Sequence, residues 1–141
     1  IDVMQGLSGT SAWYWDRNDD TRAFARRFFE RHKAMPTESQ AGMYSATTHY
    51  LKSVLAIKTD ATDAVAAQMR KMPVNDMYAK NATLRDDGKL AHDFLLVTVK
   101  SKTESKAAWD YYKISAVIPA SEAYIPLAQS DCPLVVAAKA K

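Results

Sequence analysis

Alternation between apolar and polar positions predicts a strand and then a helix at the start of the chain. Residues 5–15, QGLSGTSAWYW, carry small and aromatic side chains without a helical period, which favours a short strand that ends near the rings. The acidic, amide-bearing stretch at 18–20 offers an N-cap, and basic side chains gather a few turns later, so a helix is expected over residues 19–33. Phe24 and Phe28, four residues apart, define its core-facing stripe.

Two more helices are expected before the pattern changes. Thr37 and Gln40 have the spacing of a capping box, which predicts a second helix over residues 37–57. A third helix is predicted over residues 60–71, and Pro73 closes it. The side chains expected to form the buried face of the second helix are Tyr44, Thr47, Thr48, Leu51, Val54 and Leu55.

The second half of the chain has a β pattern. The Asp-Gly pair at 87–88 is typical of a hairpin turn, and residues 94–100 and 111–118 are predicted strands that can form a second hairpin. Three prolines are spaced through residues 119–141, so only a short helical turn is expected there, at 121–124. One strand, three helices and a hairpin region indicate the α/β class, with too few strands for a complete wound sheet.

Composition and charge narrow the class of protein. The chain has 141 residues, 48% of them hydrophobic and 25% charged, which is typical of one folded domain. Its net charge of +3 comes from scattered bases, so no basic stripe indicates nucleic acid. The longest apolar runs fall far short of the ~20 residues that a membrane-spanning helix needs.

The first residue and the single cysteine leave questions open. The sequence begins Ile1-Asp2-Val3, with neither an initiator methionine nor a secretory signal, so we expect a processed or excised piece. Cys132 allows no internal disulfide. It is either a quiet core thiol or the partner of a cysteine in a longer chain.

Side chains for catalysis do not occur in recognisable patterns. His32, His49 and His92 form no i, i+4 pair and have no C-x-x-C companion, so no metal site is expected. There is no G-x-S-x-G elbow, G-x-G-x-x-G loop or P-loop. The sequence therefore predicts a protein that is not an enzyme, with no catalytic residue and no cofactor.

Four stretches in a fixed order resemble one protein family. They read AWYWDRNDDTRAFARRFFERHKAMPTESQAGMYSATTHYLKSV, RDDGKLAHDFLLVTVK, SKAAWDYYKI and DCPLV. Together they are similar to the carboxyl-terminal third of a type I periplasmic solute-binding protein. The resemblance is to the group that serves branched-chain amino acid ABC transporters, whose relatives also take aromatic acids, amides and urea. It covers nearly the whole chain.

This resemblance implies part of a two-lobed α/β fold, in which each lobe has a mainly parallel sheet and the lobes close on a ligand. Residues 1–78 would then form the carboxyl-terminal portion of the first, amino-terminal lobe. Residues 79–141 would supply the hinge crossover and edge strands of the second lobe. Apolar faces meant for other strands would be exposed, so the chain alone is expected to dimerise or to pair with an upstream chain.

The function implied by the resemblance is transport. The protein would be the periplasmic substrate-binding component of an ABC importer, which captures a branched-chain amino acid or a related organic acid or amide, aromatic ones included. It would deliver that ligand to an inner-membrane permease. A second interpretation is the ligand-sensing domain of a receptor or regulator with the same fold, which signals on closure instead of delivering its ligand.

Three adjacent rings and a carboxylate, Trp13, Tyr14, Trp15 and Asp16, are the predicted ligand-binding residues. A strand places neighbouring side chains on opposite faces, so three large rings in a row need two buried faces or a cover from outside the core. Ligands of open α/β sheets lie beyond the carboxyl ends of strands, which is where this run is expected. The alternative is that the rings cover the lobe edge and the hinge as core residues.

Overall fold

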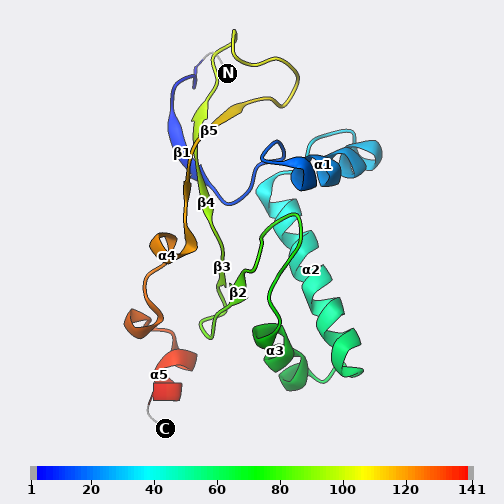
Figure 1. The fold of residues 1–141 in the computed structure, drawn as a ribbon, viewed down its shortest axis with the longest axis vertical. Coiled ribbons are helices and arrows are strands. Elements are labelled where there is room, and N and C mark those ends of the chain that lie inside the picture. The colour runs from blue at the N-terminus through cyan, green and yellow to red at the C-terminus, as the bar shows by residue number, and fades with distance from the viewer. Residues whose placement is uncertain (1–2, 140–141) are drawn as a thin grey trace.

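The computed structural model describes residues 3–139. In Figure 1 the helices α1 (Asp19–His32), α2 (Glu38–Ile57) and α3 (Thr62–Lys71) lie on one side, and a three-stranded sheet lies on the other. A small hairpin lies between the two groups, and the carboxyl-terminal segment continues below the sheet. The predicted order of one strand, three helices and a β region is confirmed.

Local caps explain where α1 begins and ends. The Thr21 N–H donates to Asn18 Oδ1 and the Asn18 N–H donates to Thr21 Oγ1, both at 3.0 Å. This reciprocal pair satisfies two backbone donors that the first turn leaves without helical partners. At the other end Lys33 takes the left-handed conformation with φ 60°, and its N–H donates to Phe29. The helix predicted over residues 19–33 is confirmed.

The predicted bounds of α2 are confirmed, but its predicted buried face is wrong. The Thr37 N–H donates to Gln40 Oε1 at 2.7 Å, as the predicted capping box requires. The residues of α2 that are buried are small or polar and recur every four residues: Ala41, Ser45, His49 and Ser53. Leu51 and Leu55 of the predicted stripe are 58% and 76% exposed.

Small side chains explain which face of α2 is buried. They allow α3 and the chain that follows it to approach the helix closely, and the polar members of the row have hydrogen-bond partners. His49 Nε2 donates to the Met69 carbonyl at 2.9 Å, and Ser45 Oγ donates to Asp76 Oδ2 at 2.6 Å. Leu51 and Leu55 of the apolar stripe therefore face outward, whereas Tyr44 of the same stripe meets Phe24 of α1 with ring centroids 5.0 Å apart.

The larger sheet joins distant parts of the chain. Strands β1 (Ser8–Ser11), β4 (Phe94–Val99) and β5 (Tyr112–Ile118) pair antiparallel in the order β1-β4-β5. The β4–β5 hairpin confirms the second predicted hairpin, and β1 is shorter than the strand expected over residues 5–15. All of this pairing is antiparallel, whereas the family resemblance implied mainly parallel sheets for the whole lobes.

The β1–β4 pairing bears on how the chain is divided. Residues 1–78 and 79–141 both contribute strands to this sheet, so a boundary at residue 78 cuts across one packed unit. The division into two lobes at that residue stays a prediction.

The first predicted hairpin is also present: β2 (Thr83–Leu84) pairs with β3 (Leu90–Ala91) across the Asp-Gly turn.

The carboxyl-terminal segment has more helix than the sequence predicts. The expected turn is present as α4 (Ala120–Ala123), followed by the 3-10 turn η1 (Leu127–Gln129) and by α5 (Pro133–Lys139). The expectation that the prolines would exclude a further helix is wrong, because Pro133 occupies the first helical position, where its missing N–H costs nothing. Cys132 is a free, half-buried thiol. Over the described part of the chain, no helix has both the length and the apolarity to cross a bilayer.

Candidate functional site

The three adjacent rings lie in the loop between β1 and α1, and each has its own partners. Trp13 is 2% exposed and packs edge-on against Phe24, with ring centroids 5.9 Å apart. Its indole N–H donates to the Met77 carbonyl at 3.1 Å. The Trp13 ring therefore joins α1 to Ala41 at the start of α2 and to the turn that follows α3.

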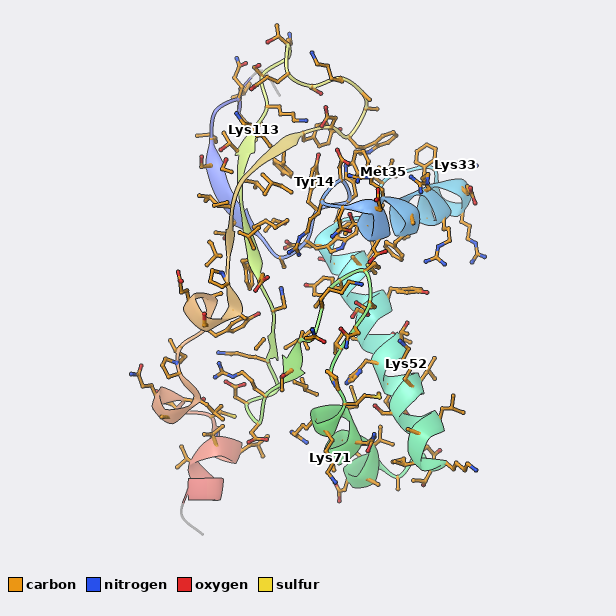
Figure 2. All side chains as sticks on the ribbon, in the orientation of Figure 1. Tyr14, Lys33, Met35, Lys52, Lys71 and Lys113 are labelled. Carbon is orange, nitrogen blue, oxygen red and sulfur yellow. The ribbon has the colours of Figure 1, made fainter. Side chains whose placement is uncertain are left out.

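Tyr14 lies between the sheet and α1 (Figure 2) and packs on Leu95 and Val97. Its hydroxyl donates to the Trp109 carbonyl at 3.2 Å and accepts from the N–H groups of Tyr111 at 3.1 Å and Tyr112 at 3.3 Å. One donor and two acceptor positions are all that a phenol hydroxyl has. Tyr14 thus has only its ring available to a ligand.

The environment of Tyr14 keeps its phenol neutral. Desolvation by burial raises the pKa of Tyr14 above its ordinary value, and the backbone N–H donors of Tyr112 and Tyr111 oppose that shift without cancelling it. A neutral hydroxyl is required for the bond that Tyr14 donates to Trp109. The raised pKa therefore preserves the link between the ring loop and the 100–112 connection.

The Trp15 side chain is hydrogen-bonded to the Trp109 carbonyl, as Tyr14 is. Its indole N–H donates to the Trp109 carbonyl oxygen at 2.9 Å, so this oxygen accepts from both Trp15 and Tyr14. Trp109 takes a left-handed backbone conformation with φ 64°, which is uncommon for a bulky residue. Asp110 steadies the same turn by accepting from the Lys100 ammonium group and the Lys106 N–H.

Asp16 is turned away from the rings. Its carboxylate pairs with Arg22 Nη1 at 2.9 Å, and Arg22 also binds Asp19 at 2.9 Å. This exposed network stabilises the start of α1. Of the four predicted site residues, the structure places Trp13, Tyr14 and Trp15 together beside one groove, and Asp16 does not line that groove.

The groove has a volume of about 610 Å³ and runs along β1 between the sheet and the α1–α2 connection. Its walls are the three rings, the sheet residues Val97 and Val99, and residues 35–38. Trp109 and Tyr111, from the connection between β4 and β5, complete the groove. A concave, mainly apolar and aromatic surface with a few polar groups is typical of a small-molecule site.

Two residues of this groove were not anticipated from the sequence. Trp109 is not among the predicted site residues, although its carbonyl accepts a hydrogen bond from Trp15, 94 residues away in the chain. Glu38 is not among the predicted site residues either, yet its Oε2 accepts from Ser11 Oγ at 2.8 Å and from the Ala12 N–H at 2.9 Å. The one available signal was the W-D-Y-Y spacing at 109–112, which resembles the W-Y-W-D run.

The polar groups around the rings have hydrogen-bond partners within the chain. In the described range 3–139, no three His, Cys, Asp or Glu side chains gather as metal ligands would. The polar groups around the rings are hydrogen-bonded to backbone and brace the loop. A ring-lined groove along a strand of an α/β fold is the kind of surface at which small-molecule sites are found.

Comparison with known proteins identifies the family. The model of a family described as periplasmic binding protein matches residues 1–104. A periplasmic binding protein from Burkholderia mallei is 42% identical over 95% of this chain, with a TM-score of 0.91. The chain belongs to the periplasmic binding protein family.

Two further structures place the chain within that family. A branched chain amino acid ABC transporter periplasmic ligand-binding protein from Burkholderia xenovorans is 40% identical over 94% of the chain, with a TM-score of 0.91. A leucine-, isoleucine-, valine-, threonine- and alanine-binding protein from Brucella ovis, at 15% identity over 88% of the chain and 34% of its own length, shares the fold with a TM-score of 0.74. The chain spans 36% of the length of each Burkholderia protein. No curated protein matches it.

These comparisons agree with the family that the sequence resembles. The expected family and the expected fold class, part of a type I periplasmic binding protein, are confirmed. The relatives are substrate-binding proteins, which fits the prediction that the chain is not an enzyme. The ligand-binding roles of residues 13–16 stay a prediction.

Proposed function

We propose that this chain forms part of the substrate-binding component of an ABC importer that works in the periplasm. It would help to capture a branched-chain amino acid or a related organic acid or amide, aromatic ones included, for delivery to a membrane permease. The observation that carries this proposal is the 40% identity over 94% of the chain to the Burkholderia xenovorans protein. The ring-lined groove supplies a surface on which an apolar ligand body can pack.

The proposed mechanism is ligand-dependent closure of two lobes. A ligand shifts such an equilibrium only by its differential affinity for the closed state, so the groups that contact it must lie on both lobes. We place β1 with β4 and β5 in one lobe because they share a sheet, which amends the division at residue 78. The ring loop, which contacts the sheet, α1 and α2, then lies beside the hinge.

An exchange experiment tests the transport proposal. The matching 36% of the Burkholderia mallei protein is replaced by this chain, and the melting temperature is screened against branched-chain amino acids, aromatic acids, amides and urea. Binding to the native state at 100 times Kd stabilises it by about 2.7 kcal/mol, so one ligand class is expected to give a clear upward shift. The unexchanged protein is the control. If it responds to a ligand class and the exchanged protein responds to none, the proposal fails.

Within the proposed site, Trp15→Ala tests the ligand role of the rings. In the exchanged protein this change is expected to weaken ligand binding at least tenfold, because it removes a groove wall and releases Trp109. Tyr50→Ala, an exposed aromatic residue of α2 outside the groove, is the matched control. Unchanged affinity in Trp15→Ala would show that the rings are only core and hinge residues.

The outer face of α2 supports a proposal about partners. Met43, Tyr44, Tyr50, Leu51 and Leu55 are large apolar side chains that are exposed on this one helix. In the 141-residue chain alone we expect this face to pair with a second copy, because contiguous apolar surface is seldom left in water. Sedimentation velocity should show a dimer, and replacing both leucines by glutamate should give a monomer. A monodisperse monomer of the unchanged chain at high concentration contradicts this proposal.

A further inference from the structure

The three strands of the larger sheet share one end, where the chain passes between the sheet and the rest of the molecule. Ser11, the last residue of β1, pairs with Leu95. Ile118, the last residue of β5, pairs with Phe94, the first residue of β4. The connection from β1 to α1 and the connection from α3 through the small hairpin to β4 both meet the sheet at this end. A change in the angle between the sheet and helices α1–α3 therefore bends the chain here, since hinges lie at loop or element-terminal residues.

Asp93, directly before β4, contacts both of the other chain passages at this end. Its Oδ1 accepts from the Ala120 N–H at 3.0 Å, just after β5. Its Oδ2 lies 4.0 Å from Nη2 of Arg17, which belongs to the loop between β1 and α1. One carboxylate therefore joins the entry to β4 with the exits from β1 and β5.

The residue before Asp93 is held from two sides. The His92 ring stacks on Phe94 of β4 with centroids 5.0 Å apart, and it meets Tyr78, in the turn after α3, edge-on at 5.1 Å. His92 Nδ1 donates to the Asp93 carbonyl oxygen at 2.7 Å. Contacts with the sheet and with the helical side thus fix the backbone at 92–93, as a pivot between them requires.

A cavity of about 250 Å³ lies between the helical side and this end of the sheet. Arg17 and residues 76–81 line it on the helical side, and residues 91–93 and Ala120 line it on the sheet side. The turn at 76–81 belongs with the helices, because Ser45 Oγ of α2 donates to Asp76 Oδ2 at 2.6 Å. Space beside the pivot allows the two parts to change their angle without overlap of closely packed atoms.

We propose that Asp93 is a positioning residue of the hinge, and that its carboxylate sets the angle between the sheet and the helices through the ion pair with Arg17. This inference rests on the proposed closure of two lobes and assigns the pivot on which that closure turns. The Arg17 and Asp93 side chains are 25% and 46% exposed, and a pair this exposed adds little to the free energy of unfolding. Its loss therefore leaves the fold intact and changes how often other angles are populated.

The distance between two spin labels measures this angle in the 141-residue chain. Lys71→Cys on α3 and Lys113→Cys on β5 carry the labels in a Cys132→Ser chain, because both lysines are exposed and lie on the two parts (Figure 2). Dilution with unlabelled chain restricts the measured distances to pairs within one molecule. In Arg17→Gln the fraction of molecules outside the main distance peak should rise about two- to fivefold, since an exposed ion pair contributes up to about 1 kcal/mol, or about fivefold in population.

Asp93→Asn separates the pivot from a helix cap. The asparagine oxygen can still accept from the Ala120 N–H, but the charge that attracts Arg17 is lost. We expect the same broadening as in Arg17→Gln, and no further broadening when both substitutions are combined, because they remove one interaction. Asp60→Asn, at an exposed position between α2 and α3, is the control and should leave the distribution unchanged.

Three results overturn the inference. If Asp93 only satisfies the first N–H of α4, Arg17→Gln and Asp93→Asn both leave the distance distribution unchanged. A broadening that comes with loss of helical circular dichroism shows unfolding instead of a change of angle. An unchanged chain without a main distance peak shows that Asp93 fixes no angle.

The outcomes separate this inference from the transport proposal, because the distance measurement needs no ligand. If both variants broaden the distribution while the exchanged Burkholderia protein binds no ligand, Asp93 still sets the angle and the transport proposal fails. If the exchanged protein binds a ligand while the distribution is unchanged in both variants, the transport proposal stands and the pivot does not depend on Asp93.

Discussion

Replacing Tyr14 by phenylalanine removes one hydroxyl and keeps the packing of the ring. The ring contacts Leu95 and Val97, and it meets Tyr112 at 5.3 Å in an edge-on arrangement that phenylalanine can retain. What is lost is the hydroxyl that joins the ring loop to three backbone groups of residues 109–112. Tyr14→Phe therefore measures how strongly one side chain ties two segments that are far apart in the chain.

The expected cost follows from those three hydrogen bonds. An average protein hydrogen bond contributes about 1 kcal/mol net, and a buried donor left without a partner costs about 1–3 kcal/mol. The Trp109 carbonyl still accepts from Trp15, whereas the N–H groups of Tyr111 and Tyr112 lose their bonds to Tyr14. We expect the free energy of unfolding to fall by about 2–3 kcal/mol.

Urea denaturation followed by circular dichroism measures this change. Ser121→Ala, which removes an exposed hydroxyl from α4, is the control and should change the free energy of unfolding by less than about 0.5 kcal/mol. The tryptophan fluorescence of the chain should also shift in Tyr14→Phe, because the Trp109 carbonyl that accepts from Trp15 loses its second donor. A loss below about 0.5 kcal/mol in Tyr14→Phe would refute the reasoning that the hydroxyl holds the two segments together.

Two further predictions concern pH. Desolvation, with smaller contributions from the Glu38 and Asp76 charges, raises the pKa of Tyr78 to about 12 from an unfolded value of 10.0. Tyr78 ionises first in the unfolded chain, so its contribution to the free energy of unfolding is complete below pH 10 and falls by about 2–3 kcal/mol by pH 12. Tyr78→Phe should remove that part of the loss of stability at alkaline pH. A variant whose stability falls with pH as that of the unchanged chain does would contradict this prediction. Burial acts to raise the pKa of Asp110, but its hydrogen bonds with Lys100 and with the Lys106 N–H outweigh burial, so that pKa lies below its ordinary value. The stability that this carboxylate contributes is therefore present above its unfolded pKa and lost as the pH falls through the folded pKa. In Asp110→Asn the free energy of unfolding should fall less steeply as the pH is lowered. An unaltered dependence on pH would argue against this prediction.

Helix ends were predictable because the groups that set them are close in sequence. The Asn18–Thr21 and Thr37–Gln40 hydrogen bonds span three residues each, and the structure has both. The turn between β2 and β3 was predictable for the same reason, because the Asp87-Gly88 pair that forms it is a local pattern. The late helix α5 escaped prediction because proline was counted only as a helix breaker, although at the first helical position it is favourable.

The buried face of α2 was not predictable from hydrophobicity. Apolar stripes normally mark the inner face of a helix, and Leu51 and Leu55 lie on such a stripe. In this chain α3 and the chain that follows it pack on the opposite face, where small residues and His49 fit and find hydrogen-bond partners. The choice of face depends on which elements are present to cover it.

The sequence by itself determined the first three helices, the two hairpins, the family and the nearness of three rings to the end of a strand, because each depends on local pattern or on motifs in order. Only the tertiary structure decided what the rings contact. Tyr14 and Trp15 meet Trp109 across more than 90 residues, and Glu38 at the start of α2 accepts from Ser11 at the end of β1. Such contacts form when the sheet closes between β1 and β4, and no local propensity encodes which distant side chains that closure brings together.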